Sequence, residues 1–204
     1  MENCLPRGTR PRGRPREFDR AAALDAAMRL FWRHGYDATP ISALTEAMGI
    51  TPPQLYAAFG DKRRLFDEAV GKYVAEDGAF GAAALEQPTA REAVEALLRT
   101  AARELTAPGR PAGCFCVLGA LNCAPGSAEV EADLRRHRAA GEVGIRRRIE
   151  AGRSAGELPA GTDAEALAKF YALVFQGMSL QARDGASRLD LERVAQLAMA
   201  AWPG

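Results

Sequence analysis

The residues best placed to do chemistry in this chain lie in the segment GITPPQLYAAFGDKRRLF, Gly49 to Phe66. Thr51 and Gln54 have the spacing of an N-cap and an N3 residue, at which two side chains can satisfy exposed backbone N–H groups reciprocally. Pro52 and Pro53 follow the cap, where the missing N–H groups would have no partner in the helix. They also offer a small apolar surface that could contact a thymine methyl group in a major groove. The segment therefore predicts a short helix whose first turn approaches another surface closely.

Two further side chains extend this surface. Tyr56 projects one turn along the same helix, with a hydroxyl able to reach a phosphate. Lys62 lies in the first turn of the next helix, which Asp61 caps, and both its charge and the helix N-terminus favour a phosphate oxygen. A preceding helix that ends at Gly49 gives the spacing of a helix–turn–helix. An ordinary pair of capped surface helices is the alternative interpretation.

The composition favours an all-α fold. The chain has 204 residues, 48% apolar and 26% charged, with abundant alanine and no long β-branched run. No apolar stretch reaches membrane-spanning length, and the N-terminus carries no apolar segment of a secretion signal. We therefore expect a cytoplasmic protein with no membrane partner. Residues 1–64 hold 11 Lys/Arg against 7 Asp/Glu, and this basic excess fits an anion-binding module.

Capping residues and apolar periodicity predict about nine helices. Asp19 caps the first, Thr39 the second with Pro40 at its first position, Thr51 the third and Asp61 the fourth, which reaches about residue 78. Longer helices are expected over about 89–106 and 113–123, and over about 127–151, 162–183 and 189–202, with capping boxes at Thr89–Glu92 and Thr162–Glu165. The predicted organisation is a basic arm at 1–16, a domain at 17–77 with the helix–turn–helix at about 40–59, and a helical domain at 78–204.

A family resemblance supports this organisation. The motifs LF…GY.AT, I..LT.AMGI and LY..FGDK..LF occur in fixed order within residues 23–70. They resemble the DNA-binding domain of TetR-type (tetracycline-repressor-like, AcrR-like) bacterial transcriptional regulators. The resemblance covers about residues 17–77, and the remainder agrees only in its layout of longer helices. It implies a three-helix helix–turn–helix domain with a larger C-terminal helical bundle. It also implies a homodimeric repressor that leaves a palindromic double-stranded DNA operator when a small-molecule effector enters the bundle.

The resemblance also assigns roles by position. Thr39 and Lys62 match phosphate-contacting sites, and the stretch from Thr51 to Gln54 matches the recognition helix with Tyr56. The DNA-binding residues predicted in this way are Thr39, Thr51, Pro52, Pro53, Gln54, Tyr56 and Lys62. Ala57 and Ala58 replace the polar or aromatic residues that many members carry there. The arginine arm is accordingly expected to contribute more, as a minor-groove hook, although a solubilising tail explains it equally well.

The C-terminal helices carry two further predictions. Wide apolar stripes favour a four-helix dimer seam, with an intramolecular core as the alternative. The predicted seam consists of Leu167, Tyr171, Phe175, Met178, Leu191, Val194, Leu197, Ala198 and Trp202. A mostly apolar effector is expected between the head and the seam, although each of its predicted contacts could equally fill a solid core. These contacts are Tyr73, Phe80, Leu97, Phe115, Leu118, Phe170 and Val174.

The remaining reactive residues give weaker signals. Cys114, Cys116 and Cys123 suggest a thiol- or metal-responsive regulator as the alternative function, against buried small hydrophobic residues. Neither histidine stands at ligand spacing from them, and no C-x-x-C pair occurs. No Ser/His/Asp set or glycine-rich phosphate loop is evident, so we expect no enzyme, no cofactor and no metal.

Overall fold

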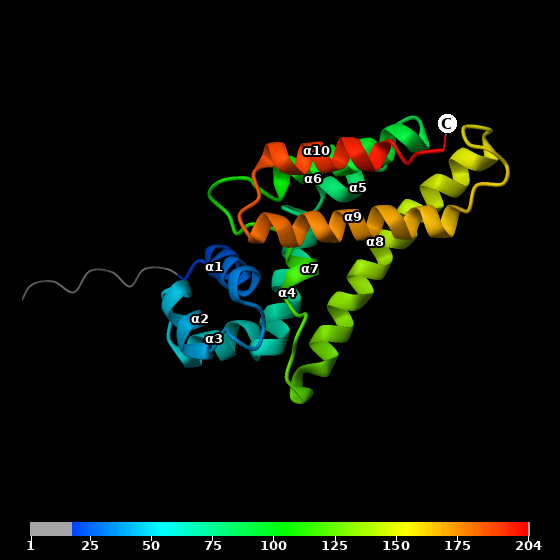
Figure 1. Ribbon diagram of the computed structural model, residues 1–204. Helices are drawn as coiled ribbons and strands as arrows, with labels where there is room; N and C mark the ends of the chain where they lie inside the picture. The colour runs from blue at the N-terminus through cyan, green and yellow to red at the C-terminus, as the bar shows by residue number, and fades with distance from the viewer. Residues whose placement is uncertain (1–17, 204) are drawn as a thin grey trace, which may run out of the picture.

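The computed structural model describes residues 18–203, and within that range the regular structure is helical, with no strand. The predicted arm at 1–16 lies outside the described residues. Figure 1 shows a head made by α1–α4 and a body made by α5–α10, with α7 between them. The predicted boundary at residue 77 falls in the turn that joins α4 to α5. The all-α fold expected from the sequence is confirmed.

The head follows its local signals closely. Its helices are α1 (Arg20–His34), α2 (Ile41–Met48), α3 (Pro52–Phe59) and α4 (Lys62–Ala75). The Asp19 carboxylate accepts hydrogen bonds from the first turn of α1, and the Asp61 carboxylate accepts one from the N–H of Arg64. Between α2 and α3, Gly49 adopts a φ of 67°, a left-handed conformation that glycine reaches at little cost.

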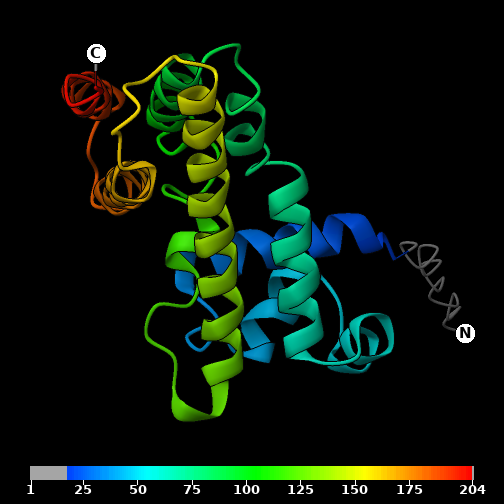
Figure 2. The same ribbon diagram turned by 90° about the vertical axis from the view of Figure 1, so that its right-hand side faces the viewer.

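The body consists of longer helices that lie against one another. They are α5 (Phe80–Ala84), α6 (Ala90–Glu104), α7 (Phe115–Leu118), α8 (Ala128–Ser154), α9 (Ala164–Arg183) and α10 (Arg188–Met199), with a 3-10 turn at Pro125–Ser127 before α8. Helices α8 and α9 pack together, as do α6 and α10. In Figure 2, α8 and α4 rise side by side from the head toward the body.

The structure corrects four details of the predicted helices. Helix α5 was not expected, and α7 is one turn instead of a helix over 113–123, because the Gly119 carbonyl accepts the Tyr36 N–H outside the helix. Pro40, not Thr39, precedes α2, since the Thr39 hydroxyl donates to the Gly35 carbonyl instead. Asp163, not Thr162, caps α9, because its carboxylate is the group that accepts from the first turn.

A cluster of aromatic rings joins the head to the body. Phe115 of α7 is fully buried, and its ring centroid lies 5.5 Å from that of Phe66, 5.7 Å from that of Tyr73 and 6.5 Å from that of Trp32. The Trp32 indole N–H also donates to the Gly113 carbonyl at 3.1 Å. One continuous hydrophobic core therefore runs from α1 and α4 through α7 into the body.

We predict that Phe115→Ala lowers the free energy of unfolding by about 3–5 kcal/mol, because the surrounding rings cannot close the cavity that it leaves. Urea denaturation at fixed protein concentration measures this loss. Tyr56→Ala is the matched control, because that side chain is 48% exposed, and it should change stability by less than about 0.5 kcal/mol. Equal effects of the two substitutions would contradict a packed aromatic joint.

Candidate nucleic-acid interface and cavity

Helices α2 and α3 form a helix–turn–helix with a rigid turn. After α2, the Gly49 N–H donates to the carbonyls of Thr45 and Glu46, and the Ile50 N–H donates to the Thr45 carbonyl at 3.0 Å. Leu55 and Phe59 are buried and anchor α3 to the head. Since these anchors lie on one side of α3, the first turn of the helix is presented to solvent on the other.

The first turn of α3 has the predicted capping arrangement. The Thr51 N–H donates to Gln54 Oε1 at 2.8 Å, and the Thr51 hydroxyl donates to the same oxygen at 3.1 Å. Pro52 and Pro53 are exposed on this turn, and Tyr56 is exposed beside them. Because Gln54 Oε1 already accepts these two bonds, the amide nitrogen is the part of Gln54 left to donate to a partner.

Lys62 lies at the start of α4, against the turn after α1. Its ammonium stands 4.4 Å from the centre of the Tyr36 ring, within the range of a cation–π contact. Partial burial lowers the pKa of Lys62, while the nearby Asp37 carboxylate opposes that shift. The contact with Tyr36 could not be predicted from the sequence, because the two residues are far apart along the chain.

Thr39 differs from the other predicted interface residues. Its side chain is 1% exposed, and its hydroxyl donates to the Gly35 carbonyl at 2.6 Å. The hydroxyl is therefore engaged inside the head, whereas Thr51, Pro52, Pro53, Gln54 and Tyr56 all lie on its surface.

Asp37 connects the head to the segment that leads into α8. Its carboxylate accepts hydrogen bonds from the Ala124 N–H at 2.7 Å and from the Ser127 hydroxyl at 2.6 Å. These two bonds lower the pKa of Asp37. One residue earlier, the Tyr36 N–H donates to the Gly119 carbonyl. The turn after α1 thus holds both ends of the segment between α7 and α8.

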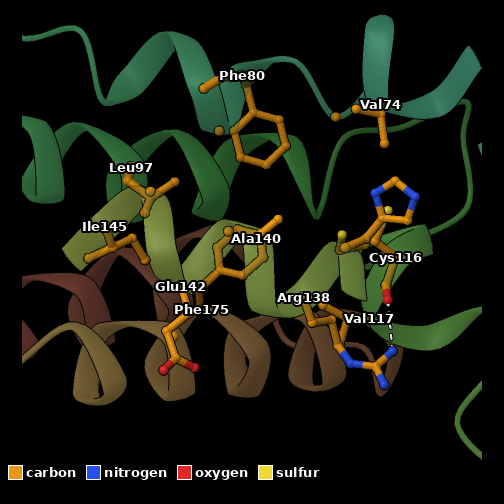
Figure 3. Close-up of a pocket in the computed structure, with 18 of the residues that line it drawn as sticks. Val74, Phe80, Leu97, Cys116, Val117, Arg138, Ala140, Glu142, Ile145 and Phe175 are labelled. Carbon is orange, nitrogen blue, oxygen red and sulfur yellow. Dashed lines mark hydrogen bonds between the residues drawn. The ribbon is translucent and has the colours of Figure 1, made fainter. Parts of the chain in front are cut away.

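A cavity of about 400 Å³ lies in the body next to the aromatic cluster, and Tyr73 belongs to both. Helices α4–α9 all contribute to its wall, and most of that wall is apolar. Figure 3 shows Phe80 and Phe175 approaching it from opposite sides and Arg138 donating to the Cys116 carbonyl at its edge, a bond of 3.0 Å. The size and apolar wall are typical of a site for a small organic molecule.

The predicted effector contacts divide into two groups. Tyr73, Phe80 and Leu97 line the cavity, whereas Phe115, Leu118, Phe170 and Val174 do not. Phe115 instead fills the aromatic cluster, and Phe170 lies on the surface, 39% exposed. The cavity wall also contains Cys114, Cys116, His137, Arg138 and Phe175. Cys114 directly precedes the short α7 and Cys116 lies within it, and both line the cavity.

The residues predicted for a dimer seam also divide by exposure. Tyr171, Met178, Leu191, Ala198 and Trp202 are buried within the single chain, so these five belong to its core. Phe175 lines the cavity, and Leu167 is partly buried. Val194 and Leu197 remain on the surface, at 47% and 78% exposure. Each of the helices α9 and α10 therefore packs one apolar face into the core and exposes apolar side chains on another face.

The three described cysteines are free thiols. Among the described residues, no group of three or more His, Cys, Asp and Glu side chains is arranged to hold a metal ion. None of the helices of residues 18–203 combines the length and apolarity needed to cross a membrane.

Two family models match this chain. One, described as bacterial regulatory proteins of the tetR family, matches residues 23–69, and the other, described as a tetracyclin repressor-like C-terminal domain, matches residues 90–198. Together they cover most of the head and the part of the body from α6 to α10.

Whole-length relatives agree with these matches. The HTH-type transcriptional repressor ComR of Escherichia coli (strain K12) is 37% identical over 194 residues, 94% of this chain and 92% of ComR. BdcR, an HTH-type transcriptional repressor of the same strain, is 33% identical over 91% of this chain and 90% of BdcR. A solved structure of a cysteine mutant of the regulator CifR, complexed with 26 bp of double-strand operator DNA, is similar with a TM-score of 0.89. It is 44% identical over 94% of this chain and all (100%) of that one.

We predict that Asp37→Ala accelerates amide hydrogen exchange in the segment at residues 119–127, because the Ala124 N–H loses its acceptor and the segment loses its attachment. Hydrogen exchange followed by mass spectrometry measures this change. Asp37→Asn keeps one acceptor oxygen and should show a smaller effect, while α6 should be unchanged in both variants. Unaltered exchange in Asp37→Ala would mean that this carboxylate does not hold the segment.

Proposed function

This chain belongs to the tetR family of bacterial regulatory proteins, and we propose that it is a homodimeric repressor released from a palindromic operator by a small molecule. The main support for DNA binding is the exposed first turn of α3. Its exposed residues Pro52, Pro53 and Gln54 face solvent, while Leu55 and Phe59 fix the helix to the head. A helix held in this way can enter a major groove without rearrangement.

The contacts that we propose differ in kind. Pro52 and Pro53 give an apolar contact, and the Gln54 amide nitrogen donates to an acceptor on a base edge, such as guanine O6 or thymine O4. Tyr56 and Lys62 contact phosphate groups and set the position of the helix. The Thr39 hydroxyl is bonded within the head, so we assign the charged contact with the DNA backbone, the clamp of this proposal, to Lys62. Its ammonium lies over the Tyr36 ring, in the turn after α1.

We predict that Lys62→Ala and Gln54→Ala have separable effects on operator binding. Loss of the Lys62 charge should weaken binding to all sequences and reduce the salt slope by about 1 per head, since one counterion fewer is released. Gln54→Ala should leave the salt slope unchanged and relax base preference at one position of each half-site, at a cost of about 1–3 kcal/mol.

Fluorescence anisotropy with duplexes selected by the protein from a random pool measures both effects. Arg33→Ala is the control for a general charge change on the head, because it also removes one positive charge, from an exposed side chain of α1 outside α2, α3 and α4. An unchanged affinity and salt slope for Lys62→Ala would rule out the proposed clamp.

We propose that the dimer forms through the open faces of α9 and α10. Their exposed apolar side chains are Phe170, Leu173, Leu180, Leu189, Val194 and Leu197. In Figure 1 the two helices run alongside each other at the edge of the body. A two-fold axis would pair this surface with its copy as a four-helix seam. The proposed seam keeps Val194 and Leu197 from the sequence prediction and replaces the buried residues by their outward neighbours.

Leu197→Asp is predicted to convert the dimer to a monomer at micromolar concentration, because it places a charge in the centre of an apolar interface. Analytical ultracentrifugation measures the change. Leu121→Asp is the matched control, since Leu121 is also exposed, at 45%, but lies outside α9 and α10. A dimer that survives Leu197→Asp unchanged would place the seam elsewhere.

The effector of this proposal is a mostly apolar molecule bound in the cavity, whose wall includes the contacting rings of Phe80 and Phe175, with centroids 6.3 Å apart. Tyr73 supports the coupling, because it lines the cavity and belongs to α4, which carries Lys62 at its other end. A ligand that fits one position of α4 better than another shifts the dimer between two head spacings. A thermal-shift screen of small apolar molecules, followed by operator release with each hit, tests this part.

A further inference from the structure

The mostly apolar wall of the cavity contains an arginine that an apolar ligand would not need. Among the described residues that line the cavity, Arg138 of α8 is the only lysine or arginine. We propose that the effector carries a carboxylate group, which pairs with Arg138 while the apolar part of the molecule fills the rest of the cavity. The inference rests on the proposed function, because it names the chemical class of the effector, an apolar monocarboxylate, for the same cavity.

The guanidinium group of Arg138 has donors to spare. Its Nη1 donates to the Cys116 carbonyl at 3.0 Å. Arg135, on the same helix, pairs with Glu131 at 2.8 Å, but Arg138 forms no ion pair with any carboxylate of residues 18–203. A guanidinium carries five N–H donors, so most of those on Arg138 stay available to a ligand. Because the side chain is partly buried, a ligand carboxylate would supply the counter-ion that such a charge requires.

The acidic side chain of the wall is already paired. Glu142 lies one turn after Arg138 on α8 and is the only carboxylate among the described lining residues. It accepts a hydrogen bond from the Lys169 ammonium at 2.6 Å, and Lys169 itself lies outside the wall. A ligand with an ammonium head would therefore meet Arg138 as a like charge and find Glu142 occupied. The wall consequently favours an anion over a cation, and discrimination of this kind depends on repulsion as well as attraction.

A second polar side chain lies at the same end of the cavity. Gln176 of α9 lines the wall, and no hydrogen bond engages its amide within the part of the chain that the structure describes. It lies one turn before Ser179, whose hydroxyl accepts the Cys114 N–H directly before α7. Arg138 also reaches α7, through the Cys116 carbonyl. A charged fork and a neutral amide donor thus both stand beside α7, and together they suit the two oxygens of a carboxylate.

The other end of the cavity offers only apolar contacts. Figure 3 shows Leu97 and Ile145 at the end away from Arg138 and Cys116. Polar groups that gather at one end of an apolar pocket fix the orientation of the molecule that it binds. The planar guanidinium matches the geometry of a carboxylate better than that of a neutral head group. The arrangement therefore fits an amphipathic molecule whose carboxylate points toward α7.

Three probes that share one alkyl chain test the assignment: octanoate, 1-octanol and octylammonium. Isothermal titration calorimetry with the full chain measures the dissociation constant of each. Octanoate should bind at least about tenfold more tightly than 1-octanol, the lower end expected for a hydrogen bond to a charged group. Octylammonium should bind more weakly than either, because it places a like charge beside Arg138.

Variants separate ligand recognition from a purely structural role of Arg138. Arg138→Gln removes the charge but keeps a donor for the Cys116 carbonyl, so it should weaken octanoate binding and abolish the preference over 1-octanol. A role in supporting α7 alone would weaken both probes equally. Arg135→Gln is the matched control, because it makes the same change at an exposed arginine of α8 outside the cavity, and it should keep the preference. The probes decide the question on the unaltered chain should Arg138→Gln fail to fold.

Operator binding gives the second readout. Octanoate should weaken operator affinity by at least about fivefold, the lower end of typical coupling between sites. Octanoate that binds no more tightly than 1-octanol or not at all, equal weakening of both probes by Arg138→Gln, or bound octanoate without loss of operator affinity would each overturn the inference. The proposed function would survive those outcomes, because operator binding by the ligand-free protein tests it.

Discussion

The packing of Phe115 between the head and the body is the constraint on which the rest of this structure depends. Its ring is fully buried among Trp32, Phe66 and Tyr73, which come from α1 and α4, while its own helix forms part of the cavity wall. Close-packed interiors respond to added volume by shifting whole elements, because they contain little free space. The cavity and the head consequently share an interior, and α7 cannot move without affecting both.

Two polar connections reinforce this joint at the surface. Asp37 holds the segment between α7 and α8, and Arg63, next to Lys62 on α4, forms an ion pair with Asp133 of α8. The first connection ends at Ala124 and Ser127, directly before α8, and the second ends on α8 itself, which forms one wall of the cavity. The turn after α1 and the start of α4 are thereby tied to the same long helix. In a dimer held through α9 and α10, this arrangement would couple the cavity to the spacing of the two heads.

The head could be predicted from the sequence because its signals are local. The caps at Asp19, Thr51 and Asp61 and the left-handed Gly49 are each determined by residues within four positions. The face of a long apolar helix depends on distant partners instead. In α9, Tyr171 is buried and Phe170 is exposed. The sequence pattern could not separate them, because both residues fit an apolar helix face.

The parts of the functional site that depend on local sequence could be predicted, and those that depend on distant contacts could not. The exposed first turn of α3 follows from the same local signals that define the helix–turn–helix. The contact between Lys62 and Tyr36 joins residues that are far apart along the chain, and Cys114 and Cys116 reach the cavity at the short helix α7, which ends before Gly119. The apolar pattern of residues 113–123 does not show that the helix ends at Leu118. The Gly119 carbonyl, directly after it, accepts from the Tyr36 N–H in the turn after α1.

The distance between the two heads of the proposed dimer tests the central claim most directly. Spin labels at Ala57, introduced through a non-natural ketone residue so that the cysteines stay intact, report this distance in pulsed dipolar spectroscopy. With operator bound, the recognition helices should be held about 34–36 Å apart, the length of one helical turn of DNA. Occupying the cavity with a ligand that releases the operator should move the distribution away from that spacing. Release of the operator with an unchanged distance distribution would contradict the account.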